Sequence, residues 1–363
     1  MKITMKRCKE CILPENYPRI TFNDEGICNY CITYKEREYL GGDALKEEIN
    51  SFLKNKKDRN KNYDCVLGLS GGRDSSYLLY YLVKVLNLKV LAYSADNGLI
   101  PEQTRLNMKN MTDMLNVKLV IEKHDLLKKC LKHTISSWVH RPSLAMVEVL
   151  CTGCRLGILR GTINFAKKNK IPVIISGGTP FERQDYRGVN GGNFSAILGY
   201  LSHIIRNPKW VMNYTYLITQ IKEYYYFFHF QKIIKKSDIL RISPFHTYIK
   251  WKEKEVISTI KNELNWEKNP NIESTWRGDC DIALLKLYFY KKTLGFNDKV
   301  DGLSNLIRDN QITRGEALKR LKKDEEIPEE VINEIFHKCG LNYLDLKNVL
   351  RKMQENKYGK KTC

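Results

Sequence analysis

Two groups of residues in this 363-residue chain have the types and spacing that chemistry requires. The first is the glycine- and serine-rich segment 67–76, which follows a short apolar run and precedes a stretch of helical periodicity. Backbone N–H groups at a helix N-terminus lack partners within the helix, so they bind anions well. The segment therefore predicts a phosphate-binding loop, in which Gly71 and Gly72 let the backbone approach a phosphate closely.

The side chains of this loop have the chemistry that nucleotide binding needs. Ser70 and Ser75 offer hydroxyl donors, Asp74 could hold Mg²⁺ or order the loop, and Arg73 adds a positive charge. We expect these four residues to be catalytic. The residues of the loop expected to contact the nucleotide are Leu69, Ser70, Gly71, Gly72, Asp74, Ser75 and Ser76.

Three loop types compete for this segment. A Walker A loop is excluded, because the chain contains no G-x-x-x-x-G-K-[ST] string. Residues 68–72 also fit the G-x-S-x-G nucleophile elbow, which needs a distal acid and then a histidine. His246 could be that histidine, but nothing in the sequence around it marks it, and an elbow gives no reason for residues 73–75. The third type is S-G-G-x-D-S, formed by Ser70 to Ser75, and here the chain closely resembles the PP-loop ATP pyrophosphatases.

That resemblance implies a defined reaction. Members of the superfamily bind ATP with the loop on its phosphates, transfer AMP to a carbonyl-type oxygen and release pyrophosphate. Ammonia or a sulfur nucleophile then replaces the adenylated oxygen. Loop amides and Mg²⁺ would stabilise the charge of the leaving pyrophosphate.

The second group consists of cysteines. Cys8 and Cys11 form one C-x-x-C pair, and Cys28 and Cys31 form another after sixteen intervening residues. Four thiolates with this spacing predict a tetrahedral structural zinc site.

A third pair, Cys151 and Cys154, lies in the segment expected to bind nucleotide, with Cys280 as a candidate third ligand. PP-loop enzymes that put sulfur into tRNA have the same order of cysteines and bind an iron–sulfur cluster. A second metal, a [4Fe-4S] cluster and reduced structural thiols all remain open for these three residues.

The composition limits the kinds of partner that the chain could have. It contains 61 Lys and Arg against 41 Asp and Glu, a net charge of +20. This charge indicates either a polyanionic partner or a proteome that is generally rich in lysine. The charges are scattered, so they do not choose the partner. No run of eighteen apolar residues and no secretory signal occurs, so we expect a cytoplasmic location.

Strands alternating with helices predict an α/β fold with a parallel sheet covered by helices on both faces. The resemblance of the loop implies that this sheet is Rossmann-like, of the PP-loop or adenine nucleotide alpha hydrolase type. Ligands bind beyond the carboxyl ends of such strands. We therefore expect further nucleotide contacts from Ser94, Asp96, Asn97, Gly177 and Gly178, with Glu182, Arg183 and Asp185 as contacts for substrate or Mg²⁺. The expected strands are 65–69, 88–94, 117–122 and 172–176, and the expected helices are 75–86, 101–115 and 151–168.

Motif boundaries divide the chain into a zinc-binding module (1–40), a linker (41–62), the ATP-binding domain (63–295) and a helical C-terminal region (296–363). Residues 190–251 are rich in Tyr, Phe and Trp. They could be a buried helical insertion, a membrane-surface helix or a partner-docking face. Thr313 to Glu316 predict a helix start.

Over residues 8 to about 330, the chain resembles the N-acetyl sugar amidotransferases of surface-polysaccharide and flagellin-sugar biosynthesis, the WbpG/PseA-like group. The resemblance implies ATP-dependent activation of an oxygen on a nucleotide-linked N-acetyl sugar or uronic acid, which ammonia then replaces. The ammonia would come from partners of the imidazole glycerol phosphate synthase type, a glutaminase and a cyclase-like protein. The matching segments are 8–14, 20–28, 70–75, 151–154, 304–309 and 312–317.

Two other functions are weighed against this one. A PP-loop tRNA sulfurtransferase would explain the basic charge and the order of the cysteines, and only under this alternative is tRNA a partner. A zinc-ribbon nucleic-acid binder would explain the charge but not the loop, and no DNA partner is expected.

Overall fold

The computed structural model describes residues 6–182, 238–270, 275–276, 278–296, 298–324 and 327–359, with isolated positions between 202 and 236. Most of the aromatic segment 190–251 lies outside the described residues, as do Arg183 and Asp185. The three interpretations of the aromatic segment therefore stay predictions.

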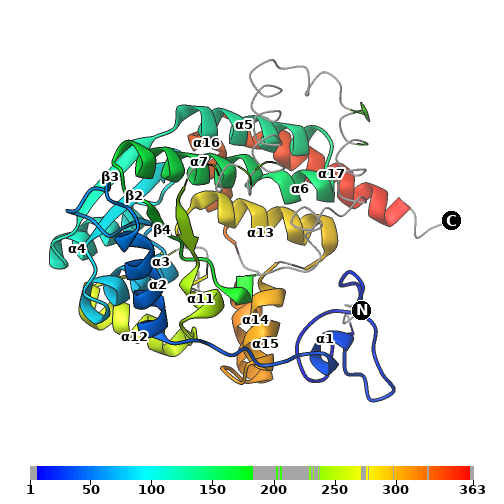
Figure 1. Cartoon of the computed structure of the whole chain (residues 1–363). Helices are drawn as coiled ribbons and strands as arrows, with labels where there is room; N and C mark the ends of the chain where they lie inside the picture. The colour runs from blue at the N-terminus through cyan, green and yellow to red at the C-terminus, as the bar shows by residue number, and fades with distance from the viewer. Residues whose placement is uncertain are drawn as a thin grey trace.

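Five parallel strands form the central sheet, in the order β3-β2-β1-β4-β5 (Figure 1). The α/β fold with a parallel sheet is confirmed. The direction of strand order changes between β1 and β4, which is where an open α/β sheet binds its ligands. The strands are β1 (Cys65–Gly68), β2 (Val90–Asp96), β3 (Lys118–Lys123), β4 (Val173–Ile175) and β5 (Leu240–Ile242).

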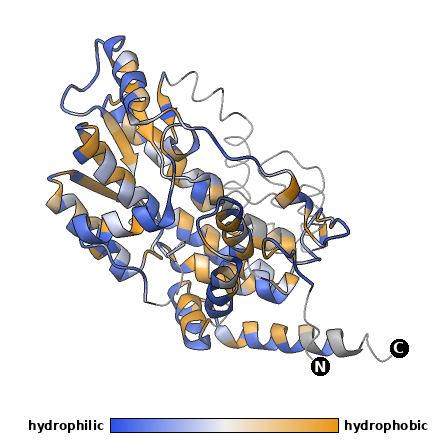
Figure 2. Cartoon of the chain, turned by 90° about the horizontal axis from the view of Figure 1, so that it is seen from below, coloured by the Kyte–Doolittle hydropathy of each residue, from blue (hydrophilic) through white to orange (hydrophobic). Residues whose placement is uncertain are grey.

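Helices cover both faces of the sheet (Figure 1). On one face lie α3 (Arg73–Tyr80), continued by the π-helical turn η1 (Tyr81–Val85), with α4 (Glu102–Met114) and α12 (Glu253–Leu264). The other face packs against α7 (Thr152–Lys168), which is covered by α5 (Asp125–His140). Because both faces are buried, the inner strands are almost continuously apolar (Figure 2).

The helical C-terminal region is confirmed, and it packs against α5 and α6 rather than standing apart. Trp138 of α5 stacks on Phe289 of α13, with ring centroids 3.8 Å apart and an angle of 11° between the planes. The predicted helix start at Thr313 is also present, since the backbone N–H of Glu316 donates to Thr313 Oγ1 at 3.2 Å. The helices are α6 (Leu144–Val149), α13 (Asp281–Leu294), α14 (Lys299–Arg308), α15 (Arg314–Asp324), α16 (Glu329–Lys338) and α17 (Tyr343–Gly359).

The range 41–62, expected to be a linker, mostly consists of a helix that belongs to the core. Helix α2 (Gly42–Lys54) buries Leu45, Ile49 and Leu53, and Tyr248 donates a hydrogen bond to Glu48. Tyr248 follows the short helix α11 (Pro244–Thr247). The many lysines of this range favoured a linker, but three apolar residues at helical spacing give α2 a face that can be buried.

The end of the segment 190–251 also differs from expectation. Residues 240–242 form β5, which pairs with β4 and so belongs to the sheet rather than to an insertion. A strand of three residues is too short to produce a periodic signal in the sequence. The remaining described elements are the turns α1 (Asn29–Ile32) and η2 (Pro180–Glu182).

Within the part of the chain that the structure describes, every helix is too short or too polar to cross a membrane.

If α2 belongs to the core, Ile49→Ala should lower the free energy of unfolding by about 2–5 kcal/mol, because it leaves a cavity at a fully buried site. Denaturant-induced unfolding followed by circular dichroism measures this change. Glu47→Ala, on the exposed side of the same helix, is the control and should change it by less than about 0.5 kcal/mol. An equally small effect of both substitutions would place α2 outside the core.

Candidate nucleotide site and four-cysteine module

The glycine- and serine-rich loop joins β1 to α3 at the point where the strand order reverses. Gly72 is the N-cap of α3, and no side chain caps the first N–H groups of the helix. Gly71 adopts a φ of +76°, and a Cβ atom there would lie 2.7 Å from Thr104 Cγ2. The loop thus presents unpaired backbone donors from a conformation that favours glycine.

The serines of the loop hydrogen-bond mainly to the loop itself. Ser75 Oγ lies 3.1 Å from Ser70 Oγ and accepts from the Ser70 N–H at 3.2 Å. Ser76 Oγ donates to the Gly72 carbonyl at 2.7 Å, so its hydroxyl is occupied. The hydrogen bonds of Ser70 go to Ser75 and to the Gly72 N–H, and no histidine engages it among the described residues. A nucleophile elbow lacks its base here.

The loop after β4 lies directly against the loop after β1. A Cβ atom on Gly177 would lie 3.2 Å from the Ser75 backbone, a tight contact, so glycine favours this close approach of the two loops. Between the two loops opens a cavity of about 760 Å³, large enough for a nucleotide and part of a second substrate. Of the predicted nucleotide contacts, those that line it are Leu69, Ser70, Gly72, Asp74, Ser75, Ser94, Asn97, Gly177 and Gly178.

Three of the predicted nucleotide contacts do not line the cavity. Asp96 accepts from the Gly98 N–H at 2.7 Å and from Arg105 Nη2 at 2.8 Å, so its carboxylate is fully engaged in a turn. The Gly71 carbonyl accepts a hydrogen bond from Trp266 Nε1, and the Ser76 hydroxyl donates to the Gly72 carbonyl. Asp96 was predicted to contact the nucleotide from its position at a strand end, but that position does not determine the direction of the side chain.

Arg73 is buried, with 2% of its surface exposed, between two tryptophan rings. Its guanidinium carbon lies 4.6 Å from the ring centroids of both Trp251 and Trp276. Arg73 Nε donates to Asp74 Oδ1 at 3.0 Å, and Nη1 donates to Glu253 Oε1 at 2.9 Å. The sequence suggested a basic group near the phosphates, whereas this arginine chiefly fixes the aspartate beside it.

Asp74 is held from two sides. Besides Arg73, Trp251 Nε1 donates to Asp74 Oδ1 at 2.8 Å, which leaves the second carboxylate oxygen for another partner. Burial raises the pKa of Asp74, although the charge of Arg73 opposes the shift. A cation placed beside Asp74 would favour its ionised form.

Asp279 is a cavity residue that sequence reasoning missed. A Cβ atom on Gly72 would lie 3.2 Å from Asp279 Cγ, so this carboxylate stands at the N-terminus of α3. Asp74 and Asp279 are the two carboxylates near the loop that could hold Mg²⁺. Asp279 directly precedes Cys280, which the sequence did indicate as a candidate ligand. More than 200 residues separate Asp279 from the loop, so its position in the sequence gives no indication that the two meet.

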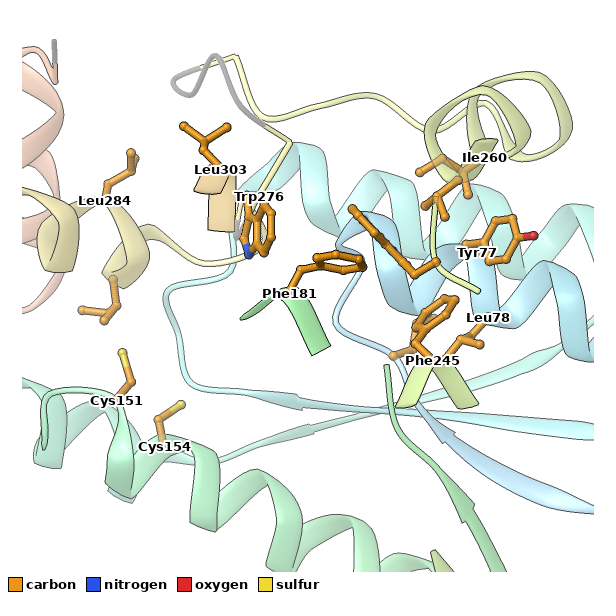
Figure 3. Close-up of a cluster of buried hydrophobic side chains, with 14 of the residues drawn as sticks. Tyr77, Leu78, Cys151, Cys154, Phe181, Phe245, Ile260, Trp276, Leu284 and Leu303 are labelled. Atoms are coloured by element: carbon orange, nitrogen blue, oxygen red, sulfur yellow. The ribbon is translucent and has the colours of Figure 1, made fainter. Parts of the chain in front are cut away.

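Cys151, Cys154 and Cys280 line the same cavity as the loop. Asn97 Nδ2 donates to Cys154 Sγ at 3.2 Å and contacts Cys280 Sγ at 3.6 Å. Figure 3 shows the sulfurs of Cys151 and Cys154 on the inner side of their helix, toward Leu284 and Trp276. Their sulfurs do not form a compact ligand group, since the one such group among the described residues is at the N-terminus.

The four predicted zinc ligands, Cys8, Cys11, Cys28 and Cys31, come together with all sulfurs within 4.8 Å of one another. The Cys8–Cys31, Cys11–Cys28 and Cys28–Cys31 sulfur distances are 3.9, 3.7 and 3.6 Å. A tetrahedral site with zinc–sulfur bonds of about 2.3 Å has sulfur–sulfur edges of about 3.8 Å. The geometry fits a single tetrahedral ion.

The electrostatics of these sulfurs agree with that fit. Hydrogen bonds from the thiols of Cys28 and Cys31 lower the pKa of Cys11 to about 2, and the resulting thiolate raises the pKa of both neighbours. Without a cation only part of the group can ionise. A bound divalent ion removes this limit, because it stabilises all four thiolates at once.

A family model described as "LPS biosynthesis protein WbpG-like, C-terminal domain" matches residues 273–361. Over these residues the chain is similar to a WbpG-like C-terminal domain. The matched segment supplies Trp276, Asp279, Cys280 and Lys286 to the lining of the cavity. It also contains α13 to α17.

The whole chain is similar to an uncharacterized protein of Methanocaldococcus jannaschii, with 23% identity over 332 residues, covering 91% of this chain and 97% of that protein. Two solved structures align at 14% sequence identity. The U34-tRNA thiolase NcsA of Methanococcus maripaludis, with its [4Fe-4S] cluster, gives a TM-score of 0.33, covering 88% of this chain and 89% of NcsA. The NMN synthetase of Francisella tularensis gives 0.36, covering 83% of this chain and 96% of the synthetase.

If the N-terminal cysteines hold one ion, the purified chain should contain about one zinc per molecule, measured by elemental mass spectrometry. Cys11→Ser should lose that zinc and melt at a lower temperature, because the module is too small to fold without it. Cys65→Ala, which removes a buried thiol from β1, is the control and should keep the metal. Iron in place of zinc, or full zinc retention in Cys11→Ser, would contradict the assignment.

Proposed function

We propose that the chain is an ATP-dependent amidotransferase that acts on a nucleotide-linked N-acetyl sugar or uronic acid during surface-polysaccharide or flagellin-glycan biosynthesis. The observation that carries the proposal is the shared cavity. The cavity is lined by the uncapped, glycine-rich loop at the reversal of strand order and by residues of the segment that matches the WbpG-like model. Nucleotide and sugar would meet between the two.

The residues have distinct parts in the proposed reaction. The N–H groups at the start of α3, with the hydroxyls of Ser70 and Ser75, would hold the phosphates of ATP. Asp74 and Asp279 are placed to hold Mg²⁺, which neutralises phosphate charge when bound. Arg73 acts on Asp74 as a positioning residue. The fixed donors would stabilise the negative charge that grows on the leaving pyrophosphate.

The proposed reaction has two steps. The carbonyl or carboxylate oxygen of the sugar attacks the α-phosphorus of ATP, the bond to the β-phosphate oxygen breaks, and pyrophosphate leaves. Ammonia then attacks the activated carbon, the carbon–oxygen bond breaks, and AMP leaves with that oxygen while nitrogen loses a proton. The product is an acetamidino sugar or an amide.

We propose that the ammonia comes from a separate glutaminase, with a cyclase-like protein, of the imidazole glycerol phosphate synthase type. The support is chemical: the sequence contains no G-x-C-x-G glutaminase elbow, and ammonia released into water would be protonated and lost. Activity with ammonium salts but not with glutamine, restored by such a partner, is the expected result.

A tRNA sulfurtransferase is the second candidate. The observation in its favour is that Cys154 and Cys280 share Asn97 as a hydrogen-bond partner inside the nucleotide cavity. Sulfur chemistry would need these thiols next to the adenylated group. Anaerobic purification, with assays for iron and labile sulfide, tests for a cluster at this place.

The deciding experiment uses anaerobically purified protein with ATP, Mg²⁺, an ammonium salt and a panel of nucleotide-linked N-acetyl and uronic acid sugars. AMP formation and product mass are followed. AMP formation that requires a sugar, with oxygen exchanged for nitrogen, supports the amidotransferase. AMP formation only with tRNA and a sulfur donor supports the sulfurtransferase. No AMP with either substrate would contradict both.

Asp74→Asn should abolish AMP formation without unfolding the protein. Burial raises the pKa of Asp74, so the folded state binds the proton more readily than the unfolded chain does. The ionised carboxylate therefore has a cost in the folded state, which offsets part of its pairing with Arg73. Asn keeps an oxygen that can accept from Arg73 Nε and Trp251 Nε1, and Glu253 still pairs with Arg73, so the thermal midpoint should change little. AMP assays and calorimetry measure the two effects.

Asp113→Asn, at an exposed position on α4, is the matched control and should retain full AMP formation. Normal turnover of Asp74→Asn would remove Asp74 from the proposed reaction.

A further inference from the structure

The four-cysteine module is joined to the nucleotide loop through α15. Arg314, the first residue of this helix, donates from Nε to the carbonyl oxygens of Cys8 at 3.2 Å and Cys11 at 3.0 Å. Two of the four cysteines are thus anchored by their backbones. Figure 1 shows α14 and α15 between the N-terminal module and the rest of the chain.

Further along α15, Arg320 reaches the loop through one buried carboxylate. Arg320 Nη1 donates to Glu253 Oε2 at 2.5 Å, while Glu253 Oε1 accepts from Arg73 Nη1 at 2.9 Å. Arg73 in turn holds Asp74. Glu253 is 5% exposed, so neither oxygen has water as an alternative partner. A shift of α15 would therefore move the residues of the loop.

A second set of contacts runs parallel to the first. Tyr34, three residues after Cys31, donates to Asp309 Oδ1 at 2.7 Å, and Asp309 Oδ2 accepts from Gln311 Nε2 at 2.9 Å. Gln311 binds the Trp251 carbonyl at 2.9 Å and the Glu253 N–H at 2.8 Å. Trp251 is the other donor to Asp74. Both supports of Asp74 thus lead back to the cysteine module.

Arg73 also faces the ligand. Its Nη2 is a buried donor with no partner among the described residues, and the side chain lines the nucleotide cavity. Buried polar groups are nearly always hydrogen-bonded, so an oxygen of the bound ligand is the natural acceptor. Ligand binding would then complete the hydrogen bonding of Arg73, one of the two supports of Asp74.

We propose that metal binding in the four-cysteine module and nucleotide binding at the loop are energetically coupled through Glu253. The metal fixes the backbone of Cys8 and Cys11, which anchors α15, and Arg320 then holds Glu253 and Arg73 in the conformation that binds nucleotide. Coupling between two binding sites is reciprocal, so nucleotide must also strengthen metal binding. The proposal rests on the proposed function only in assigning ATP to the loop.

The test measures zinc release to an excess of a colorimetric chelator, with and without Mg²⁺-saturated ATP. ATP should slow release from the wild-type chain by about fivefold or more, within the usual range of coupling between sites. In Glu253→Gln the slowing should fall below about twofold while the initial zinc content stays the same. Lys319→Met removes an exposed charge from the same helix and should behave as wild type.

Tyr34→Phe is a milder variant that interrupts only the second set of contacts, and it should give an intermediate effect even if Glu253→Gln fails to fold. ATP affinity is measured in parallel by calorimetry. If ATP binds but does not slow release in the wild type, or slows it equally in every variant, the coupling is wrong. If ATP does not bind to the zinc-loaded wild-type chain, the proposed function itself is wrong, and the coupling falls with it.

Discussion

The structure around the candidate site depends on how one buried guanidinium group is paired. Arg73 is almost fully buried, and the cost of removing a charge from water is large unless it is paired and hydrogen-bonded. Two tryptophan rings, Glu253 and Asp74 meet that requirement together. Glu253 is itself buried and also pairs with a second arginine, Arg320. Asp74, the carboxylate on which the proposed chemistry depends, takes its position from this arrangement.

The features that the sequence predicted are those encoded over short distances. The candidate phosphate loop is recognisable in six consecutive residues, and the four-cysteine cluster in two C-x-x-C pairs, because each feature is built from residues close together in the sequence. Nothing in the sequence near Glu253 or Arg320 indicates the contacts that these residues make. Their partners lie 180 and 67 residues away, and a lone glutamate or arginine on an amphipathic helix has the same pattern whether it is buried or exposed. Asp96 was predicted as a ligand contact because position at a strand end is visible in sequence, while side-chain direction is not.

The segment that carried much of the family resemblance, 304–317, has a structural explanation. Ser304 accepts from the Ile12 N–H at 3.4 Å, Asp309 binds Tyr34, and Arg314 binds the carbonyls of Cys8 and Cys11. Burial alone would lower the pKa of Arg308, but the negative charge of Cys11 and the hydrogen bond with Cys31 raise it. The segment 304–317 therefore holds the cysteine module in place, and it lies within the residues that match the WbpG-like model.

The contact of Arg314 with Cys8 spans 306 residues, nearly the whole chain. The four cysteines and the candidate phosphate loop both precede β2 in the sequence, whereas the residues that hold them in place come much later. A chain truncated before Trp251 would contain all five strands and the four cysteines but would lack Trp251, Glu253 and Arg320. Asp74 would then keep only Arg73 as a support, and Arg73 would have lost its other carboxylate partner. The order of the candidate site therefore depends on residues that are synthesised long after the loop itself.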